Sequence, residues 1–151
     1  MLRMYDYIIV EGIDGVGKTS LCNELCKEGY EYKHFAFDST CLDIKTKYMF
    51  DVFGTEKKKI VFDRSFISEF CYGNACRGVS RLSLDECIEL MNHYKEKNTL
   101  LIYVESSREI AIKRRVDDKE LGIYWDKLLL KYREIVNEAI RHMDVYVIRG
   151  E

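Results

Sequence analysis

Short apolar runs alternate with longer amphipathic segments along the whole chain. Five runs have the length and composition of β-strands: Tyr7–Val10, Tyr32–Phe37, Ile60–Phe62, Leu100–Val104 and Val145–Ile148. The first and the fourth run are almost continuously hydrophobic, which is typical of strands that are covered on both faces. The pattern therefore predicts a sheet with buried strands.

Helical spacing of apolar residues fills the segments between these strands. Helices are predicted after the first strand, where Leu21 and Leu25 are four residues apart, over Thr40–Phe53, from Ile67 to Arg77–Gly78, after two S-x-x-E capping boxes at Ser83–Glu86 and Ser106–Glu109, and over Trp125–Ile140. Strands alternate with helices, and crossovers between parallel strands are right-handed. The sequence thus predicts an α/β fold in which helices cover both faces of a parallel five-stranded sheet.

One motif lies between the first strand and the first helix. Residues 12–19 read G-x-x-x-x-G-K-T, which is the pattern of a phosphate-binding P-loop. Its glycines allow positive φ angles, so that backbone N–H groups can line a concavity beside the helix N-terminus. The residues expected to bind nucleotide are Gly12, Asp14, Gly15, Val16, Gly17, Lys18, Thr19 and Ser20. The pattern indicates a P-loop NTPase-type fold.

Two side chains of this loop have a specific predicted role. Lys18 would reach the β- and γ-phosphates of ATP, and the hydroxyl of Thr19 would ligate Mg²⁺. The alternative is a glycine-rich strand-to-helix turn that binds nothing; the strand before the motif and the helix after it favour the P-loop. The cofactors predicted from the sequence are therefore ATP and Mg²⁺.

The amino-acid composition indicates the broad class of protein to which the chain belongs. The chain has 151 residues, of which 47% are hydrophobic and 33% are charged, with a formal net charge of −2. These values predict one compact domain over residues 1–151 and give no indication of extended nucleic-acid binding. The charged start and the lack of a membrane-spanning apolar run favour a cytoplasmic protein without a membrane partner. The six cysteines contain no C-x-x-C pair, and buried reduced thiols are the expected state.

Acidic and basic side chains follow several of the predicted strands. Asp63–Arg64 comes directly after the third strand, where Asp63 would hold Mg²⁺ and Arg64 would face phosphate, although an Asp–Arg surface turn would give the same sequence. Asp14 is a candidate for orienting the acceptor hydroxyl or taking its proton; the alternative is a carboxylate that only stabilises the loop. Ligands bind at the carboxyl ends of parallel strands, so we expect Asp14, Asp63–Arg64 and Glu105 to converge.

A cationic segment near residue 114 suggests a lid. Lys113, Arg114 and Arg115 precede a polar connector that reaches Gly122, and a short lid around residues 113–122 is predicted. Arg114 and Arg115 would close over the transferred phosphoryl group and neutralise its oxygens. The alternative is that these cations cap a helix C-terminus and pair with Asp117 and Asp118.

Three stretches together resemble a known family, the thymidylate kinase and deoxynucleoside kinase group of P-loop kinases. These stretches are E-G-I-D-G-V-G-K-T at Glu11–Thr19, F-D-R-S at Phe62–Ser65 and K-R-R-V-D-D at Lys113–Asp118. The resemblance implies a parallel five-stranded core and transfer of the γ-phosphoryl group of ATP. It further implies that Asp14 holds the acceptor sugar, as in thymidylate kinases, and that Arg64 binds acceptor phosphate with Asp63 near Mg²⁺.

The chain also departs from the pattern of that family. Phe35–Thr40 resembles the phosphate-binding F-P-E-R-S-T of eukaryotic thymidylate kinases, but Ala36 replaces the proline and Asp38 the arginine. An acid at this position would repel an acceptor phosphate. Ser65 follows the Asp–Arg pair as in nucleoside kinases, and the chain is short in the helical region through which the family dimerises.

The function expected from these observations is phosphoryl transfer from ATP to a deoxynucleoside monophosphate. The alternatives are a kinase that phosphorylates a hydroxyl of a free deoxynucleoside or of a modified base in DNA, and a P-loop NTPase switch. The expected partner is a small nucleotide or nucleoside; DNA is a less favoured acceptor. The oligomeric state is open, with a homodimer among the alternatives.

Overall fold

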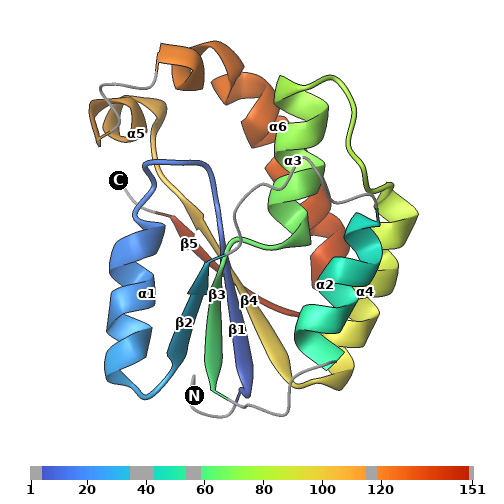
Figure 1. The fold of residues 1–151 in the computed structure, drawn as a ribbon. Coiled ribbons are helices and arrows are strands. Elements are labelled where there is room, and N and C mark those ends of the chain that lie inside the picture. The colour runs from blue at the N-terminus through green and yellow to red at the C-terminus, as the bar shows by residue number, and fades with distance from the viewer. Residues whose placement is uncertain (1–4, 35–42, 54–58, 115–118, 150–151) are drawn as a thin grey trace.

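The computed structural model describes residues 5–34, 43–53, 59–114 and 119–149. The elements are β1 (Tyr7–Glu11), α1 (Lys18–Lys27), β2 (Glu31–His34), α2 (Ile44–Phe53), β3 (Ile60–Asp63), α3 (Phe66–Cys76), α4 (Leu84–Glu96), β4 (Thr99–Glu105), α5 (Arg108–Arg114), α6 (Lys119–His142) and β5 (Asp144–Arg149). Each of the five predicted strands is present. Figure 1 shows their arrangement.

The five strands form one parallel sheet in the order β2-β3-β1-β4-β5. Helix α1 lies on one side of this sheet, whereas α2, α3, α4 and α6 lie on the other (Figure 1). The predicted parallel sheet with helices on both faces is therefore confirmed. Because all strands run the same way, their carboxyl ends meet at one edge, where the loop after β1 lies.

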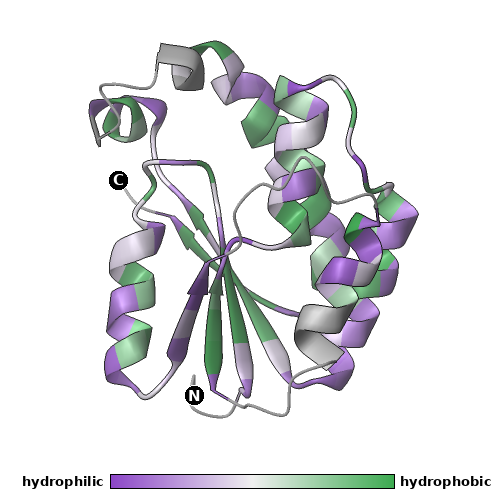
Figure 2. Cartoon of the chain, viewed as in Figure 1, coloured by the Kyte–Doolittle hydropathy of each residue, from purple (hydrophilic) through white to green (hydrophobic). Residues whose placement is uncertain are grey.

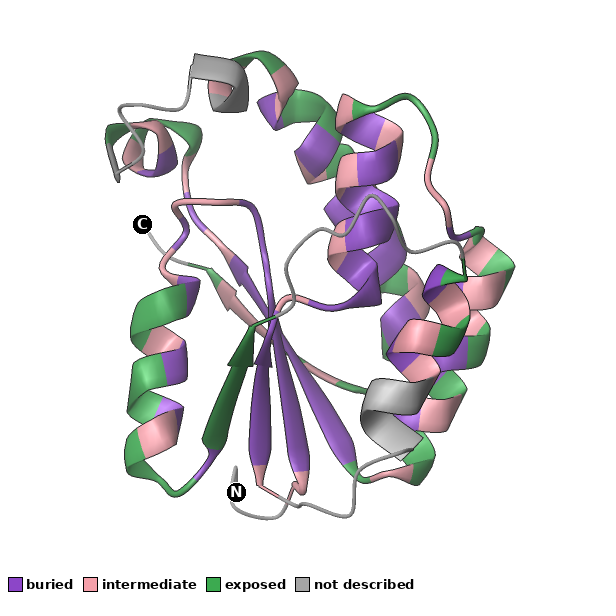
Figure 3. Ribbon diagram, in the orientation of Figure 1, coloured by how far each residue is buried: buried purple, intermediate pink, exposed green. Residues whose placement is uncertain are grey.

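Burial follows the order of the strands. All residues of β1 and β3 are buried, which explains why their sequences show no alternation of polar and apolar residues. Hydrophobic residues concentrate in these strands and in β4 (Figure 2). The edge strand β2 is exposed along its whole length (Figure 3). The structure places this strand at Glu31–His34, and residues 35–37 of the predicted strand lie outside the described part of the chain.

Helix α6 packs its apolar stripe against the sheet and α3. Trp125, Leu128, Tyr132 and Ile135 are buried, so Trp125 is a core residue rather than an exposed platform for a base. The helix begins at Lys119, several residues earlier than its apolar stripe suggested. No helix among the described residues is both long enough and apolar enough to span a bilayer.

The helix caps confirm one sequence prediction and correct another. Ser83 and Glu86 form the predicted capping box at the start of α4. At α5, however, the Oγ of Ser107 accepts the N–H of Ile110 at 3.3 Å, and the helix starts at Arg108. The capping box predicted at Ser106–Glu109 is wrong by one residue, because Ser107 takes the N-cap position and Ile110 the position that a glutamate would need.

Five cysteines of the described residues are free thiols, and Cys22, Cys71 and Cys87 among them are buried. They contribute small apolar side chains to the core. Cys41 lies outside the described residues.

A substitution at Gly12 would measure how tightly the loop after β1 is packed against β4. A Cβ atom on Gly12 would lie 2.4 Å from the carbonyl oxygen of Val104 and 2.9 Å from Cγ2 of Val16, and its φ is +154°. We expect Gly12→Ala to lower the free energy of unfolding by more than ~3 kcal/mol. Gly29→Ala is the matched control: φ there is +99° and no atom lies within 4 Å of the added Cβ. Its loss should be ~1 kcal/mol by urea unfolding, and equal losses would contradict the close approach.

Candidate active site

The P-loop sequence folds as a tight turn between β1 and α1. Gly12, Gly15 and Gly17 have φ values of 154°, 88° and 102°, as predicted for a loop whose amides line a concavity. Gly17 is the N-cap of α1, and among the described side chains none makes a capping hydrogen bond there. A helix N-terminus without a side-chain cap is suited to bind an anion, because its first N–H groups and its dipole face the ligand.

Lys18 extends back across this loop. Its ammonium group donates to the carbonyl oxygen of Ile13 at 3.0 Å and lies 4.0 Å from Oδ1 of Asp14. Only 7% of the Lys18 side chain is exposed. The cation is thus held at the loop, where it can attract phosphate with little competition from solvent.

A cavity of about 290 Å³ opens beside the loop. It is lined by residues of the P-loop, the start of α1 and the ends of β2 and β3: Asp14, Gly15, Gly17, Lys18, Thr19, Ser20, His34, Asp63 and Arg64. The predicted convergence of Asp14 with Asp63–Arg64 is therefore confirmed. The catalytic and metal-binding roles assigned to these residues stay predictions.

Asp63 has two partners on the neighbouring strand that the sequence did not reveal. Tyr32 donates its hydroxyl to Oδ2 of Asp63 at 2.6 Å, and Nδ1 of His34 lies 3.5 Å from the same oxygen. His34 is the register partner of Asp63 in the β2–β3 pair. Burial and the bond to Asp63 raise the pKa of Tyr32 above its ordinary value, so this phenol stays a donor. Both partners were hidden because they depend on strand register, which the local sequence did not specify.

Arg64 turns out of the sheet into the cavity. Its φ is +75°, in the left-handed region, and its guanidinium forms an ion pair with Asp14. The Nη1 atom donates to Oγ of Ser68 at 2.9 Å. The charges of Asp14 and Arg64 thus neutralise each other. The Asp14 carboxylate faces the Asp63–Arg64 pair.

Tyr72 contacts both Asp14 and Arg64, and the sequence analysis did not identify it. The Arg64 guanidinium lies 5.0 Å from the centroid of the Tyr72 ring, and the phenol oxygen accepts the N–H of Asp14 at 3.1 Å. Burial is the main cause that raises the pKa of Tyr72 to about 12. Ser68 and Tyr72 are four residues apart in α3, a spacing that places both on the helix face toward Arg64 and that offered a signal in the sequence.

Glu105 does not join this group, which corrects the expected convergence. Its carboxylate accepts Nη2 of Arg133 at 2.8 Å and the hydroxyl of Tyr103 at 2.8 Å, and it does not line the cavity of the P-loop. Side chains alternate along β4, so Glu105 points to the same face as Tyr103, which stacks on Tyr132 of α6. The sequence predicted that Glu105 lies at a strand end, but it did not predict the face of the sheet to which its side chain points.

The predicted lid is only partly described. Helix α5 ends at Arg114, and residues 115–118, including Arg115, lie outside the described residues, as does the side chain of Arg114. Residues 119–122 belong to α6, so the part of the predicted connector that reaches Gly122 is helical. The segment Phe35–Thr40 with Asp38 is also outside the described chain. The roles of Arg114 and Arg115 stay predictions.

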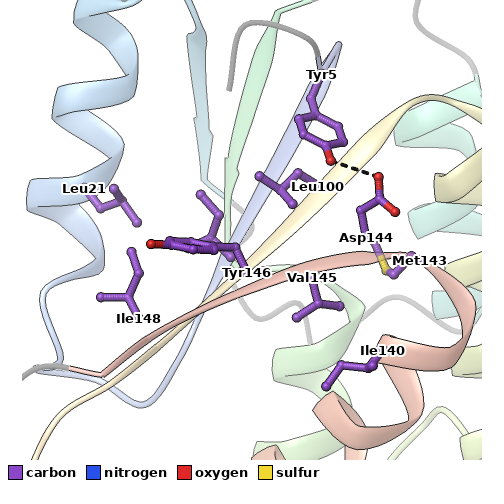
Figure 4. Close-up of a pocket in the computed structure, with 10 residues that line it drawn as sticks. Tyr5, Leu21, Leu100, Ile140, Met143, Asp144, Val145, Tyr146 and Ile148 are labelled. Carbon is purple, nitrogen blue, oxygen red and sulfur yellow. Dashed lines mark hydrogen bonds between the residues drawn. The ribbon is translucent and has the colours of Figure 1, made fainter. Parts of the chain in front are cut away.

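A second, larger hollow of about 710 Å³ lies on the α1 side of β4 and β5. Apolar side chains dominate its lining, and Tyr5 donates to Asp144 at 2.8 Å at one end, with Leu21 and Ile148 toward the other (Figure 4). The smaller cavity, in contrast, is lined by the N-terminal amides of α1 and by cationic side chains. The P-loop cavity is therefore the candidate site for phosphate despite its smaller volume.

Several solved structures share this architecture. The YorR protein of Bacillus subtilis, solved in complex with phosphorylated GDP, matches with a TM-score of 0.72 and 21% identity over 95% of this chain and 85% of that chain. This chain has a P-loop NTPase-type α/β fold. Thymidylate kinase from Candida albicans matches with a TM-score of 0.65 and 16% identity over 98% of this chain and 85% of that one.

Deoxyadenosine kinase from M. mycoides with bound dATP gives a TM-score of 0.60 and 21% identity, over 95% of this chain and 90% of that chain. Neither a scan against protein-family models nor a search of curated proteins finds a match. The similarity of this chain to these proteins is therefore a similarity of fold.

Glu105 offers a test by pH. Burial raises its pKa, but the hydrogen bonds and charge of Arg133 and the bond from Tyr103 outweigh burial, and the net pKa is lowered. A lowered folded pKa adds stability above the unfolded value of ~4.3, and this stability is lost as the pH falls through the folded value. Between about pH 7 and pH 3 the protein should lose ~0.5 kcal/mol more than Glu105→Gln in urea unfolding. If the free energy of unfolding of the two proteins changed equally with pH, the Glu105–Arg133 pair would contribute nothing to stability.

Proposed function

We propose that this protein is a kinase that transfers the γ-phosphoryl group of ATP to a deoxynucleoside monophosphate. One observation carries the proposal: the P-loop and the Asp63–Arg64 pair line the same cavity. A donor phosphate bound by the loop would therefore lie opposite an acid and an arginine. The described similarity to a thymidylate kinase and a deoxyadenosine kinase supports this reaction class through the fold alone.

The donor would bind at the loop between β1 and α1. Amides of Gly12–Ser20 would surround the phosphates, and Lys18 would exchange its bond to Ile13 for the β- and γ-phosphate oxygens. The Thr19 hydroxyl and the Asp63 carboxylate fit Mg²⁺, because both are oxygen donors that line the cavity. When bound, Mg²⁺ would offset the negative charge of the phosphates.

The acceptor would bind on the side of Arg64 and Tyr72. Arg64 would face the acceptor phosphate, and Asp14 would hold a sugar hydroxyl or orient the attacking oxygen. Arg114 and Arg115 would close from the lid over the transferred group. Cytoplasmic deoxynucleotide metabolism is the setting that such a reaction implies.

One feature of the cavity favours a second candidate, a kinase that acts on a hydroxyl of an uncharged acceptor. Among the described lining residues the cations Lys18 and Arg64 are matched by the acids Asp14 and Asp63. An acceptor phosphate must compete with Asp14 for Arg64, whereas a nucleoside hydroxyl can bond to the Asp14–Arg64 pair as it stands. A free deoxynucleoside, or a modified base in DNA, would present such a hydroxyl.

A panel of acceptors decides between these candidates. The protein is incubated with γ-labelled ATP, Mg²⁺ and deoxynucleosides, their monophosphates or DNA, beside Lys18→Ala and the control Lys27→Ala at the exposed end of α1. We expect label in monophosphates, with nucleotide affinity reduced at least about tenfold by Lys18→Ala and unchanged by Lys27→Ala. Label in nucleosides or DNA supports the second candidate. Free phosphate alone, lost in Lys18→Ala, indicates an NTPase, and no label in any acceptor refutes the kinase.

The role of Arg64 gives a separate prediction. Arg64→Ala should lower kcat/KM for the acceptor by at least about a hundredfold while the affinity for ATP changes less than about twofold. The control is Arg133→Ala, since Arg133 is half exposed and pairs with Glu105 away from the cavity. Steady-state kinetics and ATP titration are the measurements. Loss of ATP binding in Arg64→Ala would assign this arginine to the donor instead.

A further inference from the structure

A buried carboxylate lies directly behind the candidate site. Glu11 is the last residue of β1, and none of its surface is exposed. Its Oε2 accepts Oγ of Ser65 at 2.7 Å and the N–H of Ser68 at 2.9 Å. Its Oε1 accepts Oγ of Ser68 at 2.7 Å and the hydroxyl of Tyr132 at 3.1 Å. The carboxylate therefore holds the N-terminal turn of α3, where an anion is also favoured by the helix dipole.

Ser68 connects this carboxylate to Arg64. A guanidinium can only donate hydrogen bonds, so the Ser68 hydroxyl accepts Nη1 of Arg64 at 2.9 Å. Ser68 donates its own proton to Oε1 of Glu11 at 2.7 Å, and its contact with the hydroxyl of Tyr132 is longer, at 3.3 Å. Ser68 therefore links the Glu11 carboxylate to the Arg64 guanidinium.

Arg64 thus has two anionic supports of different kinds. Asp14 pairs with it directly inside the cavity, whereas Glu11 reaches it from the core through Ser68. An acceptor that bonds to Asp14 or to Arg64 disturbs the first support but not the second.

We infer that Glu11, acting through Ser68, is a positioning residue that keeps Arg64 directed at the acceptor while Asp14 changes partners. This inference rests on the proposed function. The same carboxylate also contacts Tyr132, whose hydroxyl lies 3.2 Å from the carbonyl oxygen of Gly12. The network therefore ties the first residue of the P-loop, the arginine and helix α6 to one buried anion.

A double-mutant cycle tests the relay. Ser68→Ala should lower kcat/KM for the acceptor about tenfold and change KM for ATP less than about twofold, and in the Arg64→Ala background it should cause no further loss. Ser68→Thr, which keeps the hydroxyl, should restore the rate. The control is Ser80→Ala, a half-buried serine that accepts the N–H of Leu82 outside the network. Equal losses in both backgrounds, or no loss in Ser68→Ala, would overturn the inference.

A measurement that needs no acceptor separates this inference from the proposed function. In ¹⁵N NMR of the protein without substrate, rotation of the Arg64 guanidinium should be slow and should become at least about fivefold faster in Ser68→Ala. Arg64→Lys assigns the signal. Where Ser68→Ala does not fold, Glu11→Gln replaces it and should speed the rotation in the same direction. An unchanged rotation rate overturns the relay, whereas a protein that phosphorylates no acceptor but shows the faster rotation refutes only the kinase.

Discussion

The parallel pairing of β1 with β3 is the constraint on which the site depends. Val10 is the register partner of Asp63, and the N–H of Arg64 donates to the carbonyl oxygen of Val10 at 3.0 Å. The ladder therefore continues to the residues where both chains turn away, one into the P-loop and the other into α3. A slip of one residue would turn Asp63 to the other face of the sheet, since side chains alternate along a strand. The buried apolar side chains of both strands oppose such a slip.

This constraint brings charged side chains into a small and partly buried space. A charge taken out of water is destabilising unless a partner compensates it, and here each of the four charged residues that line the described cavity has one. Lys18 bonds to Ile13, Asp63 to Tyr32 and Arg64 to Asp14. On the proposed function, phosphates that enter would exchange these internal partners for their own oxygens. The site is thus organised before a ligand binds, and binding replaces existing interactions rather than creating order from a mobile loop.

Sequence reasoning predicted what local patterns encode. The five strands, the P-loop with its three positive φ angles and the meeting of Asp14 with Asp63–Arg64 follow from apolar runs, glycine spacing and the rule for parallel sheets. Sequence reasoning failed where neighbouring residues suit the same position almost equally well and only the tertiary structure distinguishes them. Ser106 and Ser107 are both acceptable N-caps by residue type, and in the structure Ser107 caps α5.

The residues that the sequence analysis missed share the same cause. Tyr32 reaches Asp63 only through the register of two strands, and Tyr72 reaches Arg64 only because α3 packs its polar face toward the loop. Glu105 carried the right chemistry at the right strand end but lies on the face of α6. Each of these contacts joins residues that are distant in sequence or depends on the face of a strand. The spacing of Ser68 and Tyr72 could indicate a shared helix face, but local patterns could not identify the partners.

Similarity of fold at 15–21% identity shows the fold alone, and it does not select the acceptor of the proposed kinase reaction. That choice depends on the free energy needed to separate Arg64 from Asp14. A phosphate offers Arg64 a stronger partner than a hydroxyl, but it also brings negative charge close to Asp14, and the two effects oppose each other. A support for Arg64 that does not involve Asp14 shifts this balance, because Asp14 can then turn to the acceptor hydroxyl without releasing the arginine. The buried Glu11 carboxylate behind Ser68 is in the position to provide that support. On the proposed function, the acceptor preference would therefore depend on residues behind the cavity as well as on those that line it.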